Sequence, residues 1–154
     1  MRRAVLGLLL CLLLLLVACS PALAPEEAEV RVTAGCDLPV GVWYDQEASP
    51  WEEGYLPDAL RPVFFGETGD AGVRYRLFLG NDGERLAELL VAVCDTEARA
   101  VALAEHLALR LAEIAATGEE AYAPSLAGAT VRRRGKTVVY TATPENGRVL
   151  ALLF

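Results

Sequence analysis

Aromatic and acidic side chains alternate within one stretch, residues 39–72, that is also rich in proline and glycine. Both tryptophans, Trp43 and Trp51, lie there, and Glu52 and Glu53 directly follow Trp51. Aromatic rings beside carboxylates can stack a sugar or hold a cation, and a pair of carboxylates can hydrolyse a glycosidic bond. The alternative, which we expect, is that the rings cover an open face of a small sheet while the acids stay in water.

His106 is the only histidine and the obvious candidate for acid-base catalysis. It falls on the polar side of a helix expected between Thr96 and Gly118, beside Arg99 and Arg110, where a solvated surface is the expected role. The sequence contains no HExxH, P-loop, GxGxxG or EF-hand motif, and no CxxC pair. We therefore expect no catalytic residue, no metal and no cofactor.

The first residues are typical of an export signal. Arg2 and Arg3 give a positive start, the run from Ala4 to Ala18 is apolar, and it stops at Cys19. This run is shorter than the about 20 residues that a membrane-spanning helix needs. A removable signal peptide at residues 1–18 is therefore expected instead of a permanent anchor.

Two cleavage points compete after the apolar run. Ala22 and Ala24 form an ordinary small-x-small site, but Pro25 would follow that cut, which suits the ordinary signal peptidase poorly. The other is the sequence Leu16-Val17-Ala18-Cys19. All four of these positions match the lipobox, so the chain resembles the bacterial lipoprotein precursors. We recognise no family for the rest of the chain.

The resemblance implies that Cys19 receives a diacylglyceryl group, that the signal is cut before it, and that the new amino terminus is then acylated, for example with palmitate. Two or three acyl chains give stable anchoring, whereas one gives only marginal binding. The protein is then exported and held on a membrane through Cys19. Ser20 resembles lipoproteins that a two-membrane cell forwards to its outer membrane. The alternative is an ordinary secreted protein.

Export bears on the remaining cysteines. The sequence has four, of which Cys11 leaves with the signal and Cys19 would be acylated. In an oxidising compartment we expect Cys36 and Cys94 to form a disulfide, which the chain-entropy model values at about 4 kcal/mol. The alternative is two buried thiols that behave as small hydrophobic side chains.

The charge of the chain excludes one class of partner. It carries 21 acidic and 14 basic residues, a formal net charge of −7, and Arg2 and Arg3 leave with the signal. Such an acidic domain is a poor match for nucleic acid, whose phosphates need a basic surface. The one basic cluster consists of Arg132, Arg133, Arg134 and Lys136. It favours lipid headgroups, an anionic envelope polymer or an acidic protein partner, unless it is simply a solvated hairpin tip.

Hydrophobic periodicity places these residues on elements. We expect a lipidated tether at residues 19–29 and one globular domain at 30–154. Strands are expected from Val30 to Cys36 and at 73–79, 86–94, 129–133, 136–143 and 148–154, with one long helix after the 86–94 strand. Residues 89–93 are apolar at nearly every position, which indicates a central strand. The fold class is α+β, with five or six mostly antiparallel strands and one long helix on a face.

We expect a lipid-anchored cell-envelope protein with a non-catalytic binding or accessory role. The alternative is a small anchored enzyme that acts on envelope carbohydrate through carboxylates of the 45–58 loop. Those carboxylates are Asp45, Glu52, Glu53 and Asp58. A cleft that holds two of them with Trp43 or Trp51 would favour the enzyme. A third hypothesis is docking of an envelope partner on the 132–136 hairpin.

Overall fold

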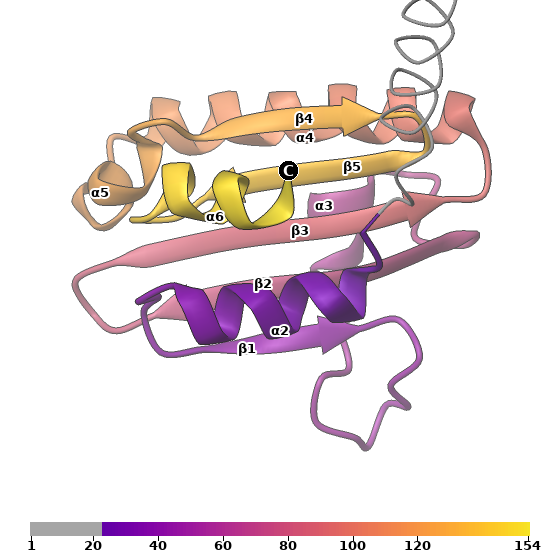
Figure 1. The fold of residues 1–154 in the computed structure, drawn as a ribbon, viewed down its shortest axis with the longest axis horizontal. Helices are drawn as coiled ribbons and strands as arrows, with labels where there is room; N and C mark the ends of the chain where they lie inside the picture. Colours follow the sequence, from indigo (N-terminus) through magenta and orange to yellow (C-terminus); the bar gives the residue numbers. More distant parts are fainter. Residues whose placement is uncertain (1–22) are drawn as a thin grey trace, which may run out of the picture.

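The computed structural model describes residues 23–154 (Figure 1). The leader, the lipobox and Cys19 lie outside the described residues, so the predictions that concern them remain predictions. Among the described residues, no helix has the length and the apolar character that crossing a membrane requires.

Five strands form one antiparallel sheet (Figure 1). Four of them match strands that the sequence predicts, whereas the first, Gly41–Asp45, lies within the 39–72 stretch, where no strand is predicted. The strands are β1 (Gly41–Asp45), β2 (Val73–Asn81), β3 (Leu86–Cys94), β4 (Thr130–Arg134) and β5 (Thr137–Ala142). Their order across the sheet is β1-β2-β3-β5-β4. The apolar run at 89–93 therefore lies in the central strand, as predicted, and β1 and β4 are the two edges.

One long helix, α4 (Glu97–Thr117), covers one face of the sheet and lies behind the strands in Figure 1. It begins after Thr96, whose side chain accepts a hydrogen bond from the backbone N–H of Arg99 at 3.1 Å. It ends at Gly118, which adopts the left-handed conformation. The short helix α3 (Arg61–Phe65) packs on the same face. The α+β fold with one long helix on a face is thus confirmed.

A second layer of helices, α2 (Pro25–Gly35) and α6 (Asn146–Leu153), covers the other face (Figure 1). Helix α2 begins inside the segment expected to be a tether and replaces the strand expected from Val30 to Cys36. Ala28 and Val32, four residues apart, are both fully buried, which is the spacing of one helix face. Helices therefore cover both faces of the sheet, and one hydrophobic core lies between the sheet and each helical layer.

Helix α6 also replaces the last strand expected at 148–154, so that prediction is wrong. Val149 and Leu153, four residues apart, face the sheet. A continuous apolar run satisfies the strand period and the helix period equally, so the pattern alone did not separate them. Asn146-Gly147, which predicts a hairpin turn, starts the helix instead.

The buried side chain of Asn146 explains this start. Its oxygen accepts hydrogen bonds from the Thr141 hydroxyl at 2.7 Å and from the backbone N–H of Thr143 at 2.8 Å. Its amide donates to the backbone carbonyls of Ser125 and Ala127, each at 2.8 Å. The last helix is therefore tied to β5 and to the short helix α5 (Ala123–Leu126), which follows η1 (Glu120–Tyr122).

Cys36 and Cys94 are both free thiols, so the prediction of a disulfide between them is wrong. Cys94 is buried with α4 on one face of the sheet, and Cys36 packs against the core on the other face. The sheet itself separates the two sulfur atoms. Burial raises the pKa of both thiols. Cys94 is the buried thiol of the alternative hypothesis, whereas Cys36 is partly exposed.

Candidate functional site: an acidic pocket at the β1 edge

A pocket of about 340 Å³ lies where β1, the loop after it and α2 meet. Helix α2 contributes Glu29, β1 contributes Trp43 and Asp45, and β2 contributes Arg76. The rest of the lining is in the loop after β1: Glu47, Ala48, Glu52, Glu53 and Gly54. Three of the predicted carboxylates, Asp45, Glu52 and Glu53, therefore share one pocket with a predicted tryptophan.

The register of β1 on β2 sets the inner wall of this pocket. Asp45 lies directly opposite Arg76, and Trp43 lies directly opposite Phe78. Residues that are paired across antiparallel strands point to the same face, so their side chains meet. The Trp43 and Phe78 ring centroids are 5.2 Å apart with a 50° angle between the planes. This contact holds the indole over the α2 side of the sheet.

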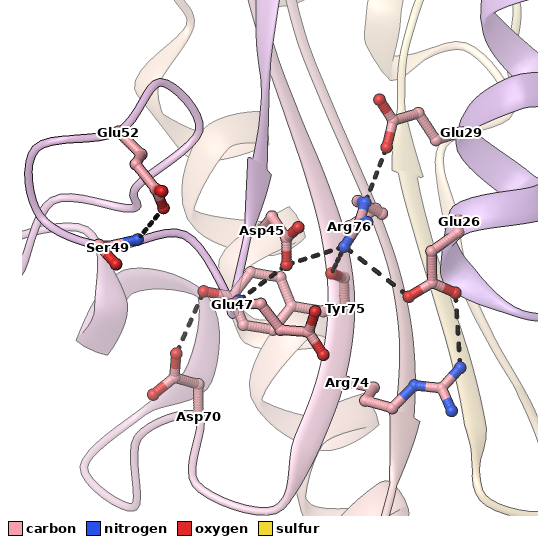
Figure 2. Close-up of polar contacts among 10 residues, drawn as sticks. All are labelled: Glu26, Glu29, Asp45, Glu47, Ser49, Glu52, Asp70, Arg74, Tyr75 and Arg76. Carbon is pink, nitrogen blue, oxygen red and sulfur yellow. Dashed lines mark hydrogen bonds and ion pairs between the residues drawn. The ribbon is translucent and has the colours of Figure 1, made fainter.

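Arg76 is the hub of the pocket (Figure 2). Its guanidinium lies 2.9 Å from Asp45 and 2.8 Å from Glu29, and more distantly, at 3.8 Å, from Glu26. It also donates to the backbone carbonyl of Tyr75 at 3.3 Å. The Arg76 side chain is only 16% exposed, so these ion pairs are stronger than solvated surface pairs. Arg76 thereby fixes α2 against the edge of the sheet.

Two further carboxylate contacts shape the loop after β1 (Figure 2). Asp45 accepts a hydrogen bond from the backbone N–H of Glu47 at 2.8 Å, and Glu52 accepts one from the backbone N–H of Ser49 at 2.6 Å. The backbone N–H of Asp45 donates to the carbonyl of Gly54 at 2.8 Å. Gly54 has φ 91°, a conformation that glycine adopts without strain. The loop is therefore closed on itself and its acids are held at the pocket.

The pocket carries an excess of negative charge. Five carboxylates line it against one guanidinium, and two of the five, Asp45 and Glu29, already pair with Arg76. Within the described part of the chain, the side chains of Glu47 and Glu53 have no hydrogen-bonded or ionic partner. Mutual repulsion between these carboxylates favours a cationic group that enters the pocket.

No group of three or more His, Cys, Asp or Glu side chains among residues 23–154 is arranged to hold a metal ion. The acids line an open pocket without converging on one point. An organic cation that contacts them separately suits this arrangement better than a bare divalent ion, which needs several oxygen ligands at about 2.0–2.6 Å.

Two residues of the predicted aromatic and acidic group lie outside this pocket. Trp51 is 84% exposed. Asp58 accepts a hydrogen bond from the Tyr55 hydroxyl at 3.0 Å and pairs with Arg61 at 3.3 Å. The expectation that all the rings cover the core therefore fails for Trp51.

A second polar cluster fixes α3 to the sheet. The Tyr75 hydroxyl donates to Asp70 at 3.1 Å, and Asp70 also pairs with Arg61; Figure 2 shows Asp70 and Tyr75. Burial, and then the nearby carboxylate of Asp70, raise the pKa of Tyr75. Since Arg61 also donates to the backbone carbonyl of Leu56 at 3.2 Å, this cluster positions the 56–72 connection.

A third cluster lies under α4. Glu88, whose side chain is 5% exposed, accepts hydrogen bonds from Arg110 at 2.5 Å, from Tyr122 at 2.9 Å and from Tyr140 at 2.7 Å. The sequence predicts that Arg110 lies on a solvated helix face, and this prediction is wrong because Arg110 pairs with the buried Glu88. All partners of this buried carboxylate are donors, and burial raises the pKa of Tyr122 and Tyr140, which the Glu88 charge raises further.

His106 is half-buried, and its Nε2 donates to the backbone carbonyl of Val63 at 2.9 Å. The ring joins α4 to α3 and does not face the acidic pocket. The solvated surface position expected for His106 is therefore wrong, because the ring is half-buried and hydrogen-bonded between two helices.

The basic cluster is divided between the two faces of the sheet. Arg133 pairs with Glu97, at the start of α4, at 3.1 Å. The guanidinium of Arg132 instead lies 5.8 Å from the ring centre of Phe154, on the α6 side. The strand alternation that separates them places Arg134 on the same side as Arg132, and Arg134 and Lys136, which lies in the turn, both line a larger groove beside α2 and α6.

Sequence reasoning missed Arg76, Glu29 and Glu88 as polar centres. Two of them carried a signal: Glu88 is the one charged residue in the strand Leu86–Cys94, and Arg76 lies in a strand between apolar neighbours. A charge is buried only when it is paired. Their partners come from elements as far apart in sequence as β3 and α4, or α2 and β2, so the pairs themselves were not visible in the sequence.

Comparisons of this chain with models of protein families, with curated proteins and with solved structures find no match.

Proposed function

We propose that this chain is a lipid-anchored cell-envelope protein that binds, without catalysis, a cationic group of an envelope component in the acidic pocket. The observation that carries the proposal is the pocket itself: five carboxylates and Trp43 around a single, already paired arginine. The lipobox ending at Cys19 supports the anchor. The ligand class is an amine-bearing sugar or peptide.

The charge balance favours a cation over a neutral sugar. Carboxylates that face one another in a concave site without a cationic partner repel each other. A cation that enters the site relieves this repulsion. Trp43 lines the same pocket, and an aromatic face attracts a cation and also packs on a sugar ring. An anionic polymer is repelled by the same charges.

The carboxylates of the pocket are better placed for binding than for acid-base chemistry. A glycosidase needs one acid that donates a proton and a second that attacks or activates water. Asp45 accepts hydrogen bonds from Arg76 and from the Glu47 backbone, and Glu52 accepts one from the Ser49 backbone. The carboxylates of Asp45 and Glu52 are therefore hydrogen-bond acceptors that stabilise the loop after β1.

The second candidate function, hydrolysis of envelope carbohydrate, is favoured by one specific observation. The pocket places Glu52 and Glu53 beside Trp43, which is the cleft that the sequence analysis named as favouring an enzyme.

One pair of sugars separates the two candidates. We expect a glucosamine oligomer, which is cationic, to bind with an affinity that falls as salt rises, and the neutral N-acetylglucosamine oligomer to bind much more weakly, as measured by titration calorimetry. Cleavage of the neutral oligomer, followed by mass spectrometry, would instead establish the enzyme. The Glu52→Gln/Glu53→Gln variant should lose glucosamine binding, whereas Glu105→Gln/Glu113→Gln, on the exposed side of α4, should keep it.

The anchor has its own test. In cells, the wild-type chain should incorporate a radioactive fatty acid and sediment with membranes, and Cys19→Ala should lose the label. Equal labelling of the two proteins would show that Cys19 is not the acylation site.

A further inference from the structure

The outer edge of β1 leaves part of its backbone unpaired. Antiparallel neighbours exchange backbone hydrogen bonds at every second residue. The backbone N–H of Asn81 in β2 donates to the carbonyl of Val40 at 2.8 Å, so the backbone groups of Val40 and Val42 face β2. Those of Gly41 and Trp43, which alternate with them in the register, point away from the sheet.

The loop after β1 covers only the far end of this edge. Asp45, two residues after Trp43, has the same backbone orientation, and its N–H donates to the carbonyl of Gly54 at 2.8 Å. Figure 1 shows no other helix or strand of the described residues along the outer edge of β1. Within residues 23–154, the N–H of Trp43 and both backbone groups of Gly41 have no hydrogen-bond partner. An edge of this kind can add a further strand.

The two edges of the sheet differ in their protection. Strand β4 carries Arg132, Arg133 and Arg134, and charged side chains on an edge strand discourage pairing with another chain. At the β1 edge, in contrast, Val40 is 81% exposed and Val42 is 38% exposed. Exposed apolar side chains beside an unpaired backbone favour cover by another chain.

The alternation of β1 defines which segment fits this edge. The Trp43 side chain lines the acidic pocket, whereas Val42 points to the opposite face of the sheet. A residue placed opposite Trp43 on an added strand shares its face and lies beside the pocket, and the next residue lies beside Val42. The edge therefore fits an extended segment in which a cationic residue is followed by an apolar one.

Charge also separates the candidate occupants. Pairing of β1 with β1 of a second copy would bring two acidic pockets onto one sheet, and like-charge repulsion between chains with a net charge of −7 disfavours this. A cationic segment is complementary to the same charges.

We propose that β1 binds an extended peptide segment of an envelope protein by strand addition, with a lysine or arginine side chain in the acidic pocket and an apolar side chain against Val42. This inference rests on the proposed function, because it identifies a polypeptide as the carrier of the cationic group. Backbone hydrogen bonds to Gly41 and Trp43 supply affinity that is independent of the peptide sequence, and the pocket and Val42 select the side chains.

A synthetic peptide, acetyl-Thr-Val-Lys-Val-Thr amide, tests strand addition with a matched control. With its lysine opposite Trp43, the backbone N–H groups of the lysine and the last threonine face β1, whereas those of the two valines face away. N-methylation of the lysine and the last threonine should weaken binding to the full chain in detergent at least about tenfold. N-methylation of the two valines should leave the affinity unchanged, as measured by titration calorimetry.

Two variants of equal exposure test the position of the peptide. Val42→Lys should weaken binding of the unmodified peptide about fivefold, because it replaces an apolar contact by a like charge. Val101→Lys, on α4 at 37% exposure, should keep the affinity. Thermal unfolding checks that both variants are folded.

The outcomes separate this inference from the proposed function. Equal binding of the two N-methylated peptides, or no effect of Val42→Lys, would overturn the inference and leave the proposed function intact. If a norleucine peptide binds as tightly as the lysine peptide, the pocket does not select a cation, and the proposed function fails together with the inference that rests on it. A concentration-dependent dimer that Val42→Lys abolishes would overturn the inference and identify a second copy as the occupant.

Discussion

Arg76 and Arg110 reach opposite faces of the sheet, and each gathers oxygen atoms that the sequence keeps far apart. Arg76 joins Glu29 of α2 to Asp45 of β1. Arg110 of α4 pairs with Glu88 of β3. At the first site the charges remain open to a pocket, whereas at the second they are enclosed. The same residue types therefore serve a candidate binding site in one place and structure in the other.

The enclosed pair predicts a large stability effect. Glu88→Gln leaves the charge of Arg110 half-buried without its anion, which should lower the free energy of unfolding by about 3 kcal/mol. Glu113→Gln, on the exposed side of the same helix, should change it by less than about 0.5 kcal/mol. Urea denaturation followed by fluorescence measures both. The double variant Glu88→Gln/Arg110→Gln should lose less than Glu88→Gln, and a larger loss would contradict the argument.

The buried tyrosines predict a loss of stability in alkali. In the folded protein, the pKa values of Tyr75, Tyr122 and Tyr140 are raised, whereas in the unfolded chain tyrosine ionises near about 10. Above that pH the unfolded chain loses protons that the folded protein keeps, so the stabilisation is complete below about pH 10 and is lost as pH rises further. Urea midpoints at pH 8 and pH 11 should therefore differ, and the difference should be smaller for Tyr140→Phe.

Helices α2 and α6 show how an element is decided by what it packs against. Both segments contain apolar residues that fit a strand as well as a helix. In the fold, the second face of the sheet needs cover, and a helix presents residues four apart to it, such as Ala28 and Val32 in α2. An additional edge strand would have left that face open to water.

The helical start of α6 predicts opposite effects for two glycines. In Gly147→Ala, the new methyl group meets no atom within 4 Å and the backbone is helical, so the free energy of unfolding should rise by about 0.5–1 kcal/mol. Gly83 has φ 89° in the β2–β3 turn, so in Gly83→Ala the free energy of unfolding should fall by about 1 kcal/mol or more. Thermal unfolding of both variants measures the changes. A destabilised Gly147→Ala would favour the hairpin turn that the sequence alone predicts.

At the scale of the whole molecule, the charges are separated across the sheet. The acidic pocket is at the β1 edge, and the basic turn between β4 and β5 is at the opposite edge.

The separation of the two cores by the sheet predicts the behaviour of the thiols. Unfolding without a reductant should make Cys36 and Cys94 both reactive to an alkylating agent, because they lie on opposite faces and are free. In the folded protein Cys94, which is 3% exposed, should react more slowly than Cys36. Mass spectrometry of the alkylated peptides measures both. A requirement for reductant would show that the disulfide forms after all.

The sequence by itself determined the elements whose signals are local. The cap at Thr96, the stop at Gly118, the turn before β3 and the apolar run of β3 each depend on neighbouring residues, and each lies where predicted. The alternation of β2 was equally local. These features together were enough for the fold class and for the central strand.

Only the tertiary structure decided the second helical layer, the free thiols and the grouping of the carboxylates. Asn146 starts a helix because its amide finds partners in β5 and α5, and Asp45 enters a pocket because the β1 register sets it against Arg76. Contacts of this kind join residues far apart in the chain, and a single sequence holds no local signal of them. The lipobox is the converse case, since its four adjacent residues predict an anchor without reference to any fold.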